Sequence, residues 1–245
     1  MAGPQTIVAG VGAGDSTRDA VVTARALAGA LHARLVLAHA YPYDLLPLES
    51  ALVEVEVGER MHADAAELVR GIRDELAPGA DTRVLPDTSP ARALHEVCED
   101  ERAGLLVIGA AGEIGSAALH HAPCPVLVGA SPPPWATVGV GVDGSPESRQ
   151  ARAFAEMLAG VTGARLIPLT VVGARGAAAP AADGAETLVG RPAEALAARS
   201  AGLDAIVVGS RGRGPVRRLL LGSTSARLVR EAACPVVVVP RGDGR

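Results

Sequence analysis

An internal duplication constrains the fold of this 245-residue chain more than any other feature. Three segments recur in the same order: TIVAGV at 6–11 returns as TVGVGV at 137–142, LLVIG at 105–109 as AIVVG at 205–209, and APCPVLV at 122–128 as AACPVVV at 232–238. Self-similarity of this kind indicates two copies of one folding unit. A proline run at 132–134 separates the copies as a stiff linker. The sequence therefore predicts two domains, 1–131 and 132–245.

Short aliphatic runs alternate with helical patterns in both copies, which predicts βαβ units and a parallel sheet covered on both faces. Hydrophobic residues make up 49% of the chain and aromatic residues only 2%, so the core must be aliphatic, as doubly covered strands require. We expect strands near 6–12, 34–40, 82–85, 105–109 and 125–129, then 137–142, 164–171, 185–189, 204–209 and 235–240. We expect helices near 16–31, 51–77, 89–102 and 113–121, then from Ser145, at 191–201 and at 223–232. The fold class is α/β, with two tandem doubly wound domains, each an open five-stranded parallel sheet flanked by helices.

The two copies have diverged in complementary ways. The second has no room for a counterpart of the long helix 51–77, because a loop rich in Ala, Gly and Pro occupies 173–184. The first has lost a loop, since 15 residues lead from Gly109 to Cys124 whereas 25 lead from Gly209 to Cys234. The extra segment is therefore a feature of the second copy alone.

That extra segment has the pattern of a phosphate-binding loop. Gly209-Ser210-Arg211-Gly212 follows an apolar strand, and nine residues later Gly222-Ser223-Thr224-Ser225 opens a helix. Glycine lets the backbone approach a ligand closely, and a helix start offers free N–H groups and the positive end of the dipole. The hydroxyls of Ser223, Thr224 and Ser225 and the charges of Arg211, Arg213, Arg217 and Arg218 would add to an anion site. We interpret the loop as a cradle for nucleotide phosphates.

The spacing Gly-x2-Gly-x9-Gly-Ser after a buried strand, followed by Cys234-Pro235 and a valine run, resembles the ATP-binding signature of universal stress proteins. The resemblance implies an adenine-nucleotide α-hydrolase-like fold and a bound ATP, with or without Mg²⁺. It implies that Asp143 faces the adenosine, that Val171 contacts adenine through its backbone, and that ribose and phosphates are held by Gly209, Gly212, Arg213, Gly222, Ser223 and Thr224. It also implies that the domains associate through the strands after Cys-Pro, 125–129 and 235–240.

Each of these residues also has a plain structural interpretation. Asp143 can turn the chain, as Asp-Gly pairs do, Ser223 can be a helix N-cap, and Gly209 can end a strand. Three functions remain open on the sequence alone. The leading one is an ATP-binding stress-response module with one site in the second domain and a scaffolding first domain. The alternatives are a slow ATPase or nucleotidyl-transfer enzyme, and a protein-interaction module whose nucleotide site is a relic.

Amino-acid composition excludes several kinds of catalytic and binding site. All 23 basic residues are arginine, so the chain has neither a P-loop lysine nor a Schiff-base lysine. We assign no catalytic residue and no metal site, because Cys98, Cys124 and Cys234 have no ligand spacing. Low aromatic content argues against single-stranded nucleic acid as a partner. No apolar run or leader pattern indicates a membrane or export, so we expect a cytoplasmic protein that pairs its own domains, with a homodimer left open.

Overall fold

The computed structural model describes residues 3–12, 14–42, 51–109, 117–173, 184–210 and 222–241. The first five strands are β1 (Thr6–Gly10), β2 (Arg34–Tyr41), β3 (Asp81–Pro86), β4 (Leu105–Ile108) and β5 (Val126–Val128). The second five are β6 (Thr137–Gly141), β7 (Arg165–Val172), β8 (Glu186–Val189), β9 (Ala205–Gly209) and β10 (Val236–Val239). The helices whose bounds the described residues define are α1 (Asp15–Leu31), α2 (Ala51–Leu76), α3 (Pro90–Asp100), α5 (Pro146–Thr162), α6 (Pro192–Ser200) and α7 (Ser223–Glu231). Within the described ranges, no helix combines the length and the apolarity needed to cross a membrane.

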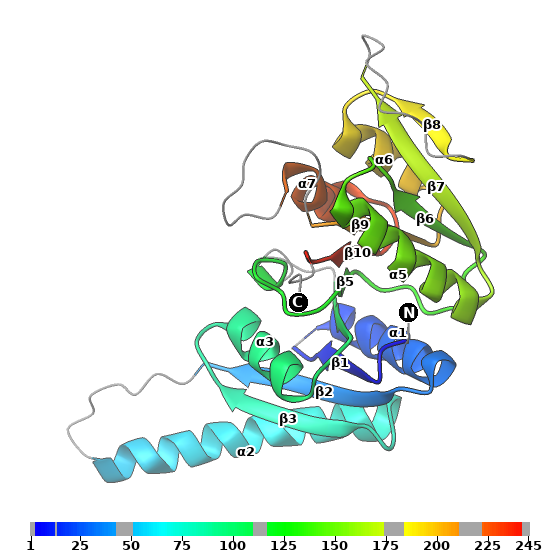
Figure 1. Cartoon of the computed structure of the whole chain (residues 1–245). Helices are drawn as coiled ribbons and strands as arrows, with labels where there is room; N and C mark the ends of the chain where they lie inside the picture. Colours follow the sequence, from blue (N-terminus) through cyan, green and yellow to red (C-terminus); the bar gives the residue numbers. More distant parts are fainter. Residues whose placement is uncertain are drawn as a thin grey trace.

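All ten strands form one continuous sheet, in the order β3-β2-β1-β4-β5-β10-β9-β6-β7-β8. Neighbours within each half are parallel, and the two halves repeat the same strand order in opposite directions from the centre. Figure 1 shows the halves stacked one above the other along this sheet. The predicted α/β class, with five parallel strands in each half, is confirmed.

The halves meet through the antiparallel pair β5–β10. Val128 pairs with Val236, Leu127 with Val237 and Val126 with Val238. All six side chains are buried, so the centre of the sheet is apolar on both faces. The expected association of 125–129 with 235–240 is confirmed, and it closes the inner edge of each half.

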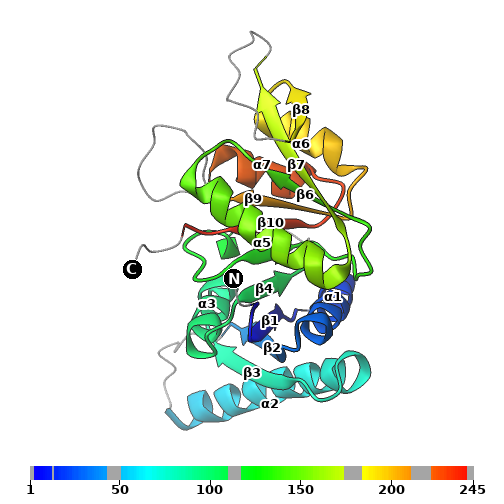
Figure 2. The same cartoon turned by 45° about the vertical axis from the view of Figure 1, so that its right-hand side comes forward.

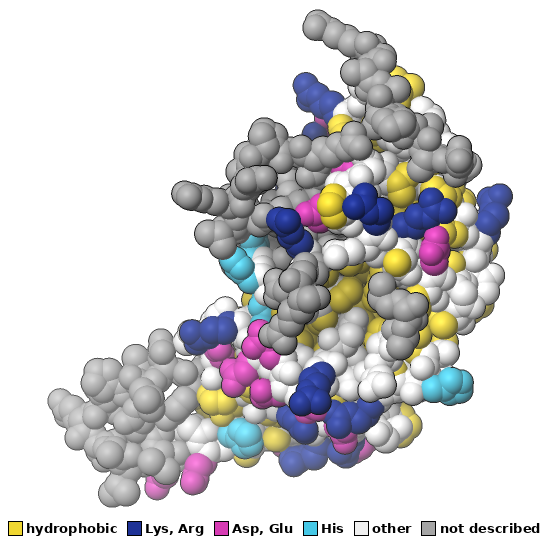
Figure 3. All heavy atoms as spheres, in the orientation of Figure 1, with side chains coloured by type: hydrophobic (Ala, Val, Ile, Leu, Met, Phe, Trp, Pro, Cys, Tyr) yellow, Lys and Arg dark blue, Asp and Glu magenta, His cyan; other side chains and the backbone are white. Residues whose placement is uncertain are grey.

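Helices cover both faces of the sheet, as Figure 2 shows. One core cluster lies under α1, α2 and α5, and it includes Leu27 of α1 and Phe154 of α5. The other lies under α3, α6 and α7, and it includes Leu94, Leu196 and Leu228. On the face shown in Figure 3, arginine side chains lie beside acidic ones over both halves, as surface ion pairs require.

Local sequence explains where these helices begin and end. The Ser145 hydroxyl accepts a hydrogen bond from the Ser148 N–H at 3.1 Å, with Pro146 in the first turn of α5. Gly163 ends that helix with φ +72°, a conformation that glycine adopts without strain. The long helix expected at 51–77 is α2, and it packs beside β2 and β3. Of the helix expected at 113–121, the structure describes residues 117–121, of which 117 and 118 are helical, and most of the loop expected at 173–184 lies outside the described residues.

Asp204 fastens the start of the second half. Its Oδ2 accepts hydrogen bonds from the backbone N–H of Ala136 at 2.9 Å, from the N–H of Thr137 at 2.8 Å and from the Thr137 hydroxyl at 3.0 Å. Burial by itself would raise the pKa of Asp204, but these three hydrogen bonds outweigh it and lower the pKa. Gly104 occupies the corresponding place in the first half and has no carboxylate to offer.

We expect Asp204→Asn to lower the free energy of unfolding at pH 7 by about 2 kcal/mol, the scale of hydrogen bonds to a charged group. Because the folded-state pKa is depressed, the carboxylate stabilises the fold above its unfolded pKa of about 4, and this contribution is lost as the pH falls through the folded value. Urea denaturation at pH 7 and pH 3 measures the effect, which should shrink at the lower pH. Asp81→Asn is the control, since Asp81 is half exposed and its ion pair with Arg34 is open to solvent. An equal loss in both variants would contradict the assignment.

Candidate functional site

The carboxyl ends of β6, β7 and β9 lie side by side and bring together residues that the sequence singled out. Gly141 pairs with Leu169, and Val140 pairs with Val207. Two residues beyond the first pair, Asp143 is level with Val171. Three residues beyond the second pair, Asp143 is level with Ser210. An open α/β sheet binds its ligands at such an edge. The structure therefore places the predicted adenosine-facing residues and the start of the predicted phosphate loop on one rim.

Asp143 forms a turn at this rim. Its Oδ1 accepts a hydrogen bond from the Ser145 N–H at 2.9 Å, and Gly144 between them has φ +78°. This turn directs the chain from β6 into α5. The hydrogen bond to Oδ1 thus supports the interpretation of Asp143 as a residue that turns the chain. Val171 is half-buried and packs against the core beneath α6 and α7.

Close packing against α5 favours glycine at position 209. A Cβ atom at this position would lie 3.1 Å from the backbone carbon, the backbone oxygen and the Cβ of Glu147 in α5. Gly109 makes the same close approach in the first half, where a Cβ would lie 2.7 Å from the Ser16 carbonyl oxygen. Since the first half lacks the phosphate loop, helix–strand packing explains both glycines whether or not a ligand binds.

Hydrogen bonds hold the two ends of the loop together. The Gly222 N–H donates to the Ser210 carbonyl at 2.8 Å, and the Ser225 hydroxyl donates to the Gly209 carbonyl at 2.9 Å. Ser225 is only 3% exposed, so the expectation that its hydroxyl adds to an anion site is wrong. The sequence pattern could not distinguish Ser225 from Ser223 and Thr224, because all three carry a hydroxyl. Only the burial of Ser225 in the folded protein shows that its hydroxyl points inward.

The start of α7 remains suited to an anion. Its N-cap is Gly222, which supplies no side-chain hydrogen bond to the helix, and the first turn carries no acidic residue. Ser223 is exposed and Thr224 half-buried. The N–H groups at a helix start and the dipole attract negative charge. Gly212 and Arg213, predicted to contact phosphate, lie outside the described residues.

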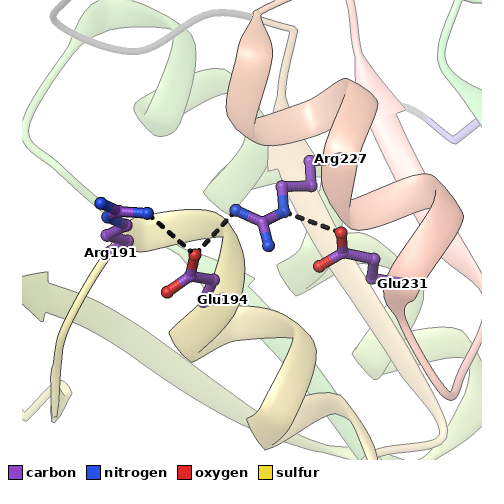
Figure 4. Close-up of polar contacts among 4 residues, drawn as sticks. All are labelled: Arg191, Glu194, Arg227 and Glu231. Atoms are coloured by element: carbon purple, nitrogen blue, oxygen red, sulfur yellow. Dashed lines mark hydrogen bonds and ion pairs between the residues drawn. The ribbon is translucent and has the colours of Figure 1, made fainter.

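Four charged residues link the surfaces of α6 and α7 (Figure 4). The Arg227 guanidinium donates from Nη1 to Glu194 at 2.8 Å and from Nε to Glu231 at 2.7 Å. Arg191 approaches the same Glu194 oxygen at 3.5 Å. The hydrogen bond from Arg227 lowers the pKa of Glu194. The network joins the N-cap residue and the first turn of α6 to the middle and the C-terminal end of α7.

A second ion pair near the rim was not anticipated from the sequence. Arg241, just after β10, places its Nε 3.6 Å from Oε1 of Glu147. The Glu147 side chain is only 11% exposed, whereas that of Arg241 is 69% exposed. Sequence reasoning missed this pair because its members lie far apart along the chain and match no motif.

Two of the cysteines, Cys98 and Cys234, lie in surroundings that disfavour the thiolate. A hydrogen bond with Cys124, together with burial, raises the pKa of Cys98, and burial raises the pKa of Cys234 to about 12. Thiols that stay protonated are weak nucleophiles and poor metal ligands. Among the residues that the structure places, no three His, Cys, Asp or Glu side chains gather closely enough to hold a metal ion.

Comparisons with known proteins agree with this architecture. The sequence profile of the universal stress protein family matches residues 4–129 and 178–240. A universal stress protein from Mycobacterium tuberculosis is 34% identical, with 55% of this chain and 58% of the relative covered, and one from Thermus aquaticus is 52% identical over 54 residues, 21% of this chain and 39% of the relative. The chain thus spans less than two thirds of the length of these relatives.

Two solved structures align over almost the whole chain. A universal stress protein from Archaeoglobus fulgidus has a TM-score of 0.71 at 20% identity and covers 98% of this chain and 97% of its own. A protein of unknown function from Pseudomonas aeruginosa has a TM-score of 0.65 at 16% identity, with 98% and 94% covered. At these identities the likeness concerns the fold, and both structures share the tandem arrangement along their full length. Taken with the profile match over both halves, they show that the chain belongs to the universal stress protein family.

Proposed function

We propose that this protein is a stress-response signalling module that binds one ATP at the carboxyl edge of its second half. The observation that carries the proposal is the convergence at this edge of Asp143, Val171 and the closed loop ends at Ser210 and Gly222, beside an uncapped helix start. Universal stress protein membership and the Gly-x2-Gly-x9-Gly-Ser spacing support a nucleotide as the ligand.

The proposed contacts follow the strand order. Asp143 and Val171, at β6 and β7, would face the adenosine. Ribose and phosphates would extend over β9 to the start of α7, near Gly209, Gly222, Ser223 and Thr224, with Gly212 and Arg213 proposed from the sequence alone. When Mg²⁺ accompanies the nucleotide, it would neutralise part of the phosphate charge.

We further propose that binding, and not turnover, is the function. The chain has no lysine to place against a γ-phosphate, and its arginines and backbone N–H groups can hold a phosphate without activating a water. The first half, proposed as the domain 1–131, would serve as a scaffold that pairs through β5 with β10 of the domain 132–245.

The decisive test is to denature purified protein with heat and identify any released nucleotide by mass spectrometry, followed by calorimetric titration with ATP. About one adenine nucleotide per chain supports a single site. Two per chain would contradict the assignment to one half. If no nucleotide is released and added ATP produces no binding heat, the proposed function is wrong. The protein-interaction module with a relic nucleotide site then becomes the leading alternative.

A further inference from the structure

The pair formed by Glu147 and Arg241 stands directly beside the proposed phosphate site. Glu147 belongs to the first turn of α5 and closely approaches Gly209, as the 3.1 Å distances to a Cβ at that glycine show. Arg241 lies two residues beyond Val239, whose carbonyl accepts a hydrogen bond from the Ser210 N–H at 2.8 Å. The pair therefore lies where β9 and β10 end.

The start of α7 belongs to the same group of contacts. Ser210 accepts a hydrogen bond from the Gly222 N–H at 2.8 Å, and Gly222 is the N-cap of α7. Consecutive hydrogen bonds thus lead from the N-cap of α7, through Ser210, to the end of β10 that carries Arg241. The start of α7 and Arg241 therefore lie at the same edge of the sheet, where β9 and β10 end.

The two halves differ at both members of the pair. Ser16 takes the place of Glu147, since it makes the matching close approach to Gly109. Ser131 takes the place of Arg241, because each follows its Cys-Pro cysteine by seven residues. Both charges are therefore present in the half that retains the phosphate loop, and both are absent from the half that lost it. If the ion pair served only to hold α5 against the end of a strand, it would be equally useful in either half. Its presence in the second half alone therefore suggests a role linked to the phosphate loop.

The charges also fit a phosphate ligand. A largely buried carboxylate such as Glu147 would repel a nearby phosphate unless a cation neutralised it. Arg241 supplies that cation, and its guanidinium has five N–H donors, of which the contact at 3.6 Å occupies one side. Its 69% exposure leaves it able to turn toward an incoming anion.

Strand order indicates which phosphate it would meet. From the proposed adenosine position at β7 and β6, the sheet continues through β9 to β10. Neighbouring strands lie about 4.8 Å apart, so β10 is about 10 Å from β6. A nucleotide laid in this direction has its last phosphates nearest Arg241.

We propose that Arg241 contacts the terminal phosphates of the bound nucleotide and that Glu147 holds Arg241 until phosphate displaces it. This inference rests on the proposed function. It makes the site prefer ATP over ADP and AMP, because only the longer nucleotides reach the end of β10. Glu147 is a competitor for the guanidinium and sets how much phosphate charge is needed to engage it.

Calorimetric titration of Arg241→Gln with ATP, ADP and AMP tests the proposal. We expect the Kd for ATP to rise about 10-fold, as for loss of one charged hydrogen-bonding group, with the Kd for AMP within twofold of the unchanged protein. Arg241→Lys should recover part of the ATP affinity. Arg152→Gln is the matched control, because Arg152 is an exposed arginine of α5 that pairs with Glu156. It should leave all three affinities unchanged.

Glu147→Gln gives the opposite expectation. Removing the competing carboxylate frees Arg241 and should tighten ATP binding about threefold. An equal loss for all three nucleotides in Arg241→Gln, or unchanged ATP affinity with a lower thermal midpoint, would show that the pair is a structural clamp. Weaker ATP binding in Glu147→Gln would refute the competition. If the unchanged protein binds no adenine nucleotide, the proposed function itself fails. If Arg241→Gln binds ATP as tightly as the unchanged protein does, only the proposal for Arg241 fails.

Discussion

Replacing Gly222 with glutamate is expected to weaken ATP binding at least about 100-fold. The new carboxylate would stand at the N-cap of α7, where the proposed phosphates bind. Two unit charges 4 Å apart repel by about 4 kcal/mol at an effective dielectric constant of 20, and a triphosphate carries several charges. The fold should survive, because Gly222 has φ −59° and ψ 142°, which any residue adopts, and because an acid at a helix start is stabilising.

Gly222→Gln distinguishes the effect of the added charge on ATP binding from the effect of the added side-chain bulk. Glutamine has the shape of glutamate without its charge, so we expect the Kd for ATP to rise only a few-fold. Calorimetric titration measures both variants, and thermal melts without nucleotide check that each is folded. Equal losses in the two variants would mean that bulk, and not charge, excludes the nucleotide. Unchanged ATP affinity in Gly222→Glu would show that the phosphates do not bind at the start of α7.

Truncation of Leu127 to alanine is expected to lower the free energy of unfolding by about 3 kcal/mol. Leu127 is fully buried at the centre of the sheet, pairs with Val237 across the antiparallel joint and with Val107 on β4, and belongs to a core cluster that spans both halves. The cavity would therefore weaken the contact through which the halves stabilise each other.

Chemical denaturation followed by two signals tests this expectation. Trp135, the single tryptophan, is buried in the core cluster that contains Leu127 and Val237, so its fluorescence reports the loss of this core, while circular dichroism reports both halves. We expect the two transitions to coincide and to move to lower denaturant together. Val57→Ala, at a 44% exposed position of α2, is the control and should change the stability by less than about 0.5 kcal/mol. Separate transitions, or an unmoved midpoint in Leu127→Ala, would mean that the halves fold independently of the joint.

The sequence by itself determined the architecture of this protein. Valine-rich runs alternating with amphipathic segments specify parallel strands covered by helices, because both periodicities are local. The duplication then predicted two such units, and the family resemblance predicted their contact through the strands after Cys-Pro, which the β5–β10 pair confirms. The edge that carries Asp143, Val171 and Gly209 also followed, since parallel strands present their carboxyl ends together.

Only the tertiary structure decided how individual side chains are used. It showed that Gly209 packs tightly against α5 and that the Ser225 hydroxyl is turned inward to the Gly209 carbonyl. It also brought Arg241 to Glu147 across the end of the sheet. These facts depend on burial and on contacts between residues far apart in the chain, which no local pattern encodes. Periodicity specifies which face of an element is apolar, whereas the partner of a polar group is chosen only when the elements have packed together.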